Sequence, residues 1–265
     1  MRHWFIAATL VLGVILGAVA VACSDRAGGN TGDGTVVAIP KSTGGTEGGR
    51  DSIVQGPASR YAPAQTDLPG NFDVDESQTF TQNISTFSSS YWFDTAQQGN
   101  ELAQKWKIID GFKVFYNPVG LAAAVLQGGY YINAEVYLFQ DTAGAAQAFA
   151  YYQQRLSAVA GSESVKTRGL ANQSAAYEII AGTVASSSTP AVYDRFIFRR
   201  GNIVASVTTT GAQGKATIDA ARNIAVIMDD RILGKRDSTE PTPIPTPEFH
   251  LQPTPEASGT AGAGS

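Results

Sequence analysis

Residues 193–209 read YDRFIFRRGNIVASVTT, and this segment decides the fold because two alternating apolar runs meet at a Gly-Asn dipeptide. Gly-Asn suits the tight two-residue turn of a β-hairpin. If Arg200 pairs with Ile203 across the turn, apolar residues lie opposite apolar residues on one face. The pairs further along are Phe198 with Ala205, Phe196 with Val207 and, on the reverse face, Arg195 with Thr208. The segment therefore predicts an antiparallel hairpin.

The sequence on either side of this hairpin alternates between strand and helix patterns. Extended runs are predicted at 111–116, 130–139 and 175–180. Apolar residues that recur every three or four positions predict helices over 80–91, 95–106, 145–159 and 218–232, the third beginning at a cap on Asp141 or Thr142. The stripe of the first is Phe80, Ile84, Phe87 and Tyr91. Helices that alternate with groups of strands imply an α+β domain, with a largely antiparallel sheet covered by helices.

The order of these elements resembles that of exported PsbP/Mog1-like α/β/α sandwiches. A curved sheet packed over a helix, as in cystatin-like or NTF2-like domains, fits the same order. The resemblance extends over residues 67–235 and depends on element order, with no shared motif. It therefore implies an architecture and assigns no functional residue.

The N-terminus has the pattern of a secretory signal, with Arg2 and His3 before an uncharged stretch over residues 4–22. The segment Ala20-Val21-Ala22-Cys23 resembles the lipobox of bacterial lipoproteins, although Leu is commoner than Ala at its first position. The resemblance implies that residues 1–22 are removed and that Cys23, the only cysteine, carries a diacylglycerol. We therefore expect a lipid-anchored protein on the extracytoplasmic face of the cell membrane.

An uncleaved membrane helix is the alternative, because 19 apolar residues can span a bilayer. Both interpretations place the rest of the chain outside the cytoplasm, since the positive charge precedes the apolar stretch.

Composition divides the remaining chain into three parts. Residues 23–66 are rich in Gly, Ser and Thr and predict a flexible linker. Residues 67–235 predict a single folded domain. Residues 236–265 contain repeated Thr-Pro pairs and predict a disordered tail.

The predicted domain contains neither histidine nor cysteine, because His3, His250 and Cys23 all lie outside it. This excludes Ser-His-Asp and Cys-His nucleophiles and zinc sites built from those residues. Asp73, Asp75 and Glu76 are grouped but lack the length and glycine of an EF-hand loop, so we expect neither a metal nor a cofactor. A formal charge of −4 without a basic run argues against nucleic acid as a partner. Carboxylate chemistry stays open through scattered acids: Glu101, Asp110, Glu135, Glu178 and Asp194.

The strand at 130–139 offers the most distinctive candidate surface. One face is continuously apolar, whereas the other carries Tyr131, Asn133, Glu135 and Tyr137. Aromatic rings around a carboxylate and an amide are typical of a groove for a sugar, a peptide or a small amphipathic ligand. The alternative is that a helix covers this face and that Glu135 pairs with Arg195 or Arg199.

These patterns predict a cell-surface lipoprotein whose non-catalytic domain binds an envelope component, a partner protein or a small ligand. The alternatives are an envelope hydrolase that uses two carboxylates and a carrier of a small apolar ligand.

Overall fold

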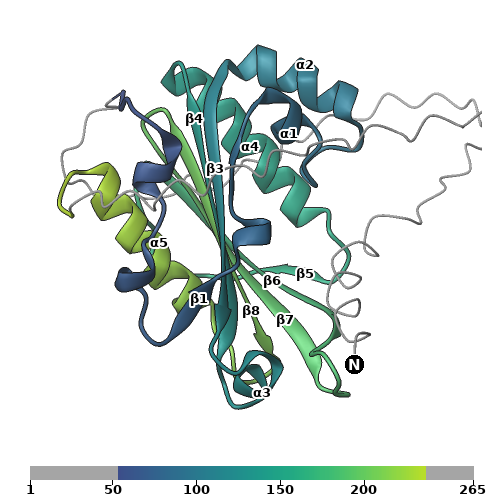
Figure 1. Ribbon diagram of the computed structural model, residues 1–265. Coiled ribbons are helices and arrows are strands. Elements are labelled where there is room, and N and C mark those ends of the chain that lie inside the picture. Colours follow the sequence, from purple (N-terminus) through teal and green to yellow (C-terminus); the bar gives the residue numbers. More distant parts are fainter. Residues whose placement is uncertain (1–52, 237–265) are drawn as a thin grey trace, which may run out of the picture.

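The computed structural model describes residues 53–236, which form an eight-stranded antiparallel sheet with helices on both faces (Figure 1). The strands are β1 (Phe72–Val74), β2 (Phe80–Gln82), β3 (Ile108–Pro118), β4 (Tyr130–Phe139), β5 (Ser162–Ser164), β6 (Gln173–Thr183), β7 (Pro190–Arg200) and β8 (Ile203–Ala212). The α-helices are α1 (Ile84–Ser88), α2 (Ala96–Trp106), α3 (Leu121–Leu126), α4 (Thr142–Ser157) and α5 (Ile218–Ile232). The predicted α+β class is confirmed.

Several predicted features lie outside the described residues: the apolar stretch 4–22, Cys23, the linker up to residue 52 and the tail from residue 237. Across residues 53–236, no helix is long and apolar enough to cross a membrane.

The strand order is β1-β3-β4-β8-β7-β6-β5, and β2 pairs with β3 beside β1. The β7–β8 hairpin lies near the centre of the sheet and has the predicted register, with Arg200 opposite Ile203 and Arg195 opposite Thr208. Local turn chemistry and side-chain alternation were sufficient to predict this register, because a slip of one residue would exchange the two faces.

The sheet separates two hydrophobic clusters, and helices cover each of them (Figure 1). The face that packs against α5 and the N-terminal segment is called the α5 face, and its side chains include Ile132, Phe196 and Val207. The opposite face packs against α1, α2 and α4 and is called the α4 face. Helices on both faces make a three-layer sandwich, and of the two expected architectures this matches the α/β/α type.

The predicted helix over 80–91 is wrong. Phe80 begins β2, where it pairs with Lys113, and α1 starts only at Ile84. Asn83 explains the break, because its side chain accepts a hydrogen bond from the Thr86 backbone N–H at 3.0 Å and caps a new helix. Tyr91 lies beyond the end of α1. A local cap therefore overrode a spacing of apolar residues that suggested one longer helix.

Packing against the sheet begins ahead of Asp67, where the sequence placed the start of the domain. Ala58, Tyr61 and Ala62 are buried in the cluster of the α5 face. Val54 exchanges hydrogen bonds with the Asn202 side chain in the β7–β8 turn, at 2.8 and 3.2 Å. Composition alone could not separate these packed residues from the linker, because few of them are large and apolar.

The sequence also missed the short elements β1, β5 and α3, since three to six residues are too few to establish a period. Helix α3 occupies the β3–β4 connection. It starts after Gly120 at φ 90°, and Leu121 itself has a φ of 49°. This left-handed start is the conformation that glycine tolerates best.

The start of α2 provides a test of local stability. The Thr95 hydroxyl accepts a hydrogen bond from the Gln98 backbone N–H at 3.1 Å, so Thr95→Ala should lower the free energy of unfolding by about 1 kcal/mol. Thr95→Ser keeps the acceptor and should lose much less. Urea unfolding followed by tryptophan fluorescence measures both, and equal losses would show that the cap is not responsible.

Candidate functional site

The four side chains predicted to line a groove all project from β4 onto the α4 face, but their exposure differs. Tyr131 and Asn133 are half-buried, whereas Glu135 is 2% exposed and Tyr137 is fully buried. Only the first two can therefore contact a ligand without rearrangement.

Tyr137 belongs to the hydrophobic cluster of the α4 face. Its ring packs edge-on against Phe87 at 5.1 Å, and its hydroxyl oxygen accepts a hydrogen bond from Trp92 Nε1 at 3.3 Å. Burial, followed by the nearby charge of Glu135, raises the pKa of Tyr137 well above its ordinary value. The prediction that Tyr137 lines a ligand groove is corrected, because side chains of α1, of the segment between α1 and α2, and of α4 pack over it.

Glu135 is covered by the same segment. The Tyr91 hydroxyl donates a hydrogen bond to Glu135 Oε2 at 2.7 Å. Burial raises the pKa of Tyr91 well above its ordinary value, and the charge of Glu135 adds to that rise while Arg195 opposes it. Tyr91 is thus a neutral donor that satisfies a buried carboxylate. The alternative interpretation offered an ion pair with Arg195 or Arg199, and the structure has this hydrogen bond from Tyr91 instead.

Arg195 lies on β7, and its guanidinium group packs over two aromatic rings of the same covering segment. Its Cζ is 4.9 Å from the ring centroid of Tyr91 and 5.2 Å from that of Trp92. Its Nε donates to Thr208 Oγ1 on β8 at 2.7 Å. These contacts hold a half-buried cation in one orientation on the sheet.

Strand register places Arg195 in one row with Asn133. Asn133 lies opposite Thr208, and Thr208 lies opposite Arg195. The neighbouring row consists of Tyr131, Thr210 and Tyr193. These six side chains share the α4 face and are called the Asn133 patch: Tyr131, Asn133, Tyr193, Arg195, Thr208 and Thr210.

Asn133 has a side-chain atom that lacks a hydrogen-bond partner within residues 53–236. Its Oδ1 atom is buried and has no hydrogen-bond partner among the described residues. Buried polar atoms are normally hydrogen-bonded, and an unpaired acceptor costs about 1–3 kcal/mol. This acceptor is enclosed in the observed conformation, so a donor from outside the domain reaches it only when the side chains around it shift.

Two parts of the fold border the patch. At one end lies the Tyr91–Trp92 segment, and at the other lies α3, whose buried Val125 belongs to a small cluster against which Tyr131 and Tyr193 pack. Figure 1 shows α3 at one end of the sheet and α1, α2 and α4 towards the other. Sequence analysis could identify Asn133 and Arg195 separately, but the β4–β8 pairing that aligns them is not visible in the sequence.

Of the five acids considered for catalysis, register brings Glu178 and Asp194 opposite each other, on β6 and β7. Burial and then the charge of Glu178 raise the pKa of Asp194 to about 6. A raised pKa suits a general acid, but Asp194 has no exposed surface and its side chain lies on the α5 face, away from the Asn133 patch. Asp194 therefore presents no carboxyl group to a substrate in the observed conformation, whereas Glu178 is partly exposed.

The remaining acids have structural partners. Asp110 accepts hydrogen bonds from the Ala58 and Gly111 backbone at 2.6 and 2.9 Å, and Glu101 is exposed on α2 beside Gln97. Asp75 caps a short 3-10 helix (Glu76–Gln78) through Ser77. Within residues 53–236, no group of three or more acidic, histidine or cysteine side chains is arranged to hold a metal ion.

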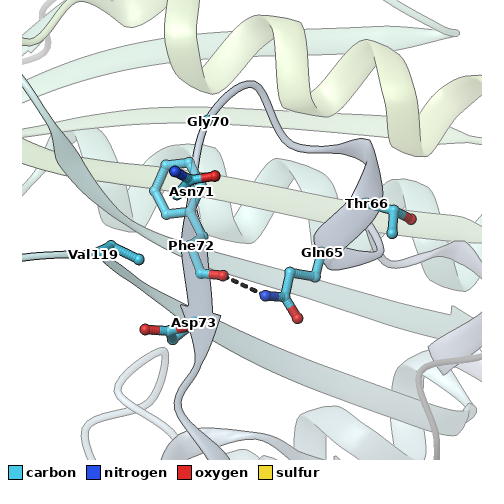
Figure 2. A pocket seen from close by; sticks show the side chains of 7 residues that line it. All are labelled: Gln65, Thr66, Gly70, Asn71, Phe72, Asp73 and Val119. Atoms are coloured by element: carbon cyan, nitrogen blue, oxygen red, sulfur yellow. Dashed lines mark hydrogen bonds between the residues drawn. The ribbon is translucent and has the colours of Figure 1, made fainter.

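A separate hollow of about 550 Å³ lies on the β1 edge of the sheet. Figure 2 shows its lining and the hydrogen bond at 2.5 Å from Gln65 Nε2 to the Phe72 carbonyl. The lining residues are Gln65, Thr66, Gly70, Asn71, Phe72, Asp73 and Val119. This lining has one carboxylate and no cation, so it provides neither a catalytic pair nor a charged anchor for an anion.

Comparison with known proteins assigns neither a family nor a functional residue. No family model matches the sequence, and no curated protein matches it. Among solved structures, the chain is similar to the extracellular domain of PknH from Mycobacterium tuberculosis, with 14% identity and a TM-score of 0.36. The match covers 67% of this chain and 95% of that domain. A likeness at this level carries no argument about binding or location.

Proposed function

We propose that the chain is a lipid-anchored, extracytoplasmic binding domain without catalytic activity, and that its ligand binds at the Asn133 patch. The location rests on the signal-like residues 4–22 and the lipobox-like segment that ends at Cys23. The binding site rests on one observation above all. Asn133 Oδ1 is a buried acceptor without a partner in the described part of the chain, beside half-exposed hydroxyl and aromatic groups.

The ends of the described chain lie at one end of the sheet, and this position supports an exposed patch. The described chain enters beside the β7–β8 turn, where Val54 contacts Asn202, and α5 returns towards the same end, where Asp229 pairs with Arg200. Helix α3 lies at the other end of the sheet (Figure 1). A linker that joins the domain at the Asn202 end would therefore leave the α3 end of the patch away from the attachment point.

Mass spectrometry of the mature N-terminus tests the anchor. We expect the chain to begin at Cys23 with a diacylglycerol on its sulfur. Two acyl chains bury enough CH₂ groups to hold a protein on a bilayer. An intact N-terminal segment with a free Cys23 thiol would contradict this part of the proposal.

NMR titration tests the binding site. Mature chain with Cys23→Ser would be titrated with N-acetylglucosamine, glucuronic acid and N-acetyl-dialanine, which all offer N–H or O–H donors. We expect the Asn133 side-chain amide and its neighbours to shift with at least one probe. Asn133→Ala should weaken that binding by about tenfold or more, since it removes a hydrogen-bond acceptor in a partly desolvated site.

Asn223→Ala is the matched control, because Asn223 is exposed on α5 across the sheet. It should leave binding unchanged. Absence of shifts at the patch with every probe, or equal effects of the two variants, would contradict the proposed site. Turnover of a probe would contradict the non-catalytic assignment.

A further inference from the structure

Arg195 has no carboxylate partner within residues 53–236, unlike four arginines of the domain that pair with aspartates. Several arginines of the domain form ion pairs with aspartates: Arg155, Arg200, Arg231 and Arg236. Across residues 53–236, no carboxylate forms an ion pair with Arg195, although its side chain is half-buried on the sheet. Its charge is therefore available to a group from outside the domain.

Glu135 is the nearest candidate for an internal partner, and the structure engages it elsewhere. Its Oε2 accepts from Tyr91, whose hydroxyl also interacts electrostatically with Arg195. Lys113 lies directly opposite Glu135 on β3 and adds a second positive charge to this region. Two basic side chains, Lys113 and Arg195, and one acidic side chain, Glu135, therefore lie beside the Asn133 patch.

The contacts of Arg195 also set its geometry. The Nε donates to Thr208, and the planar group packs over Tyr91 and Trp92. A guanidinium held in this way loses little freedom on binding, and its terminal N–H groups match the two oxygens of a carboxylate.

We propose that the ligand of the Asn133 patch is a small molecule with a carboxylate, which pairs with Arg195 while a nearby N–H or O–H donates to Asn133 Oδ1. This inference rests on the proposed function and adds the chemical class of the ligand. Asn133 and Arg195 lie on strands separated by β8, so their Cα atoms are roughly 10 Å apart. The carboxylate and the donor must then be several ångströms apart, a separation that an acidic sugar or a peptide C-terminus provides.

Matched acid and amide probes test this class directly. The mature chain with Cys23→Ser would be titrated with glucuronic acid and glucuronamide, and with N-acetyl-dialanine and its C-terminal amide. We expect at least one acid to bind about tenfold more tightly than its amide, and added salt to reduce the difference. The pair that shows the effect distinguishes a sugar acid from a peptide C-terminus.

Arg195→Gln should remove the preference for the acid. Arg222→Gln is the matched control, because Arg222 donates to the Arg168 carbonyl oxygen and projects from α5 on the other side of the sheet. Thermal unfolding of each variant checks that it is folded. The ratio of acid affinity to amide affinity is also measured on the chain with Arg195 intact, so the ligand class can be tested even if Arg195→Gln does not fold.

The outcomes separate the two proposals. If amides bind at the patch as tightly as the acids, the carboxylate inference is overturned while the binding site stands. If neither acids nor amides shift the Asn133 resonances, the proposed function fails and the inference fails with it. An acid preference that persists in Arg195→Gln would overturn the role of Arg195.

Discussion

Replacing Asp194 with asparagine is expected to raise the free energy of unfolding at pH 7 by about 1–3 kcal/mol. The Asp194 side chain has no exposed surface, and neither carboxylate oxygen has a hydrogen-bond partner within residues 53–236. Thr209, opposite it on β8, also has a buried hydroxyl without a partner there. An ionised carboxylate in this position is costly, and asparagine removes the charge at nearly the same size.

The effect should depend on pH in a defined direction. Burial and then Glu178 raise the pKa of Asp194 to about 6 in the folded chain, compared with the ordinary value of 3.8. The folded state therefore binds more protons than the unfolded state between about pH 4 and pH 6, and stability falls as pH rises through that range. The contribution is most favourable below about pH 4 and is lost above about pH 6.

Urea unfolding of both proteins at pH 4, 5, 6 and 7 measures this dependence. The Asp194→Asn variant should lack the decline that Asp194 causes and should match the unsubstituted chain near pH 4. Glu178→Gln is a useful companion, because removing the neighbouring charge should recover part of the stability above pH 6. A variant less stable than its parent at pH 7 would show that the ionised carboxylate has a favourable partner.

Asp67→Ala should have the opposite effect on stability, and a larger one. We expect it to lower the free energy of unfolding by about 3–5 kcal/mol. Asp67 Oδ2 accepts from Arg231 Nη2 at 2.6 Å and from its Nε at 3.1 Å. The Arg231 side chain is 1% exposed and that of Asp67 is 14% exposed. Without this carboxylate, the buried guanidinium would lose its aspartate partner on the N-terminal segment.

The exposed pair between Asp94 and Arg155 provides the control. Asp94 is 62% exposed in its side chain, so Asp94→Ala should cost less than about 1 kcal/mol. Both variants can be compared by urea unfolding under identical conditions. Similar small losses in the two would mean that the Asp67–Arg231 pair contributes no more than a surface ion pair.

Much of the fold could be predicted because its strongest signals are local. The β7–β8 hairpin, β4 and the helices α2, α4 and α5 follow from alternation, periodicity and caps within short segments. The predicted helix over 80–91 failed for a local reason too, since the Asn83 cap outweighed the spacing of the apolar residues. Elements of three to six residues contain too little pattern to be recognised.

The candidate site was predicted in part. Asn133 and Tyr131 are half-exposed as a ligand surface requires, but Glu135 and Tyr137 are buried because Tyr91 and Trp92 cover them. Which positions of a strand are covered depends on a segment more than forty residues away in the chain. Arg195 and Asn133 lie in one row only because β8 pairs with both of their strands.

The sequence by itself determined the hairpin at the centre of the sheet, the α+β class and the absence of histidine and cysteine from residues 67–235. It also predicts lipidation at Cys23, which lies outside the described residues. Only the tertiary structure decided that Asp67 holds Arg231 across 164 positions, that Asp194 is buried without a partner in the described chain, and that Asn133 and Arg195 share a row. The physical reason is that turns and periodic faces arise from neighbouring residues, whereas burial and charge pairing depend on which distant segments pack together.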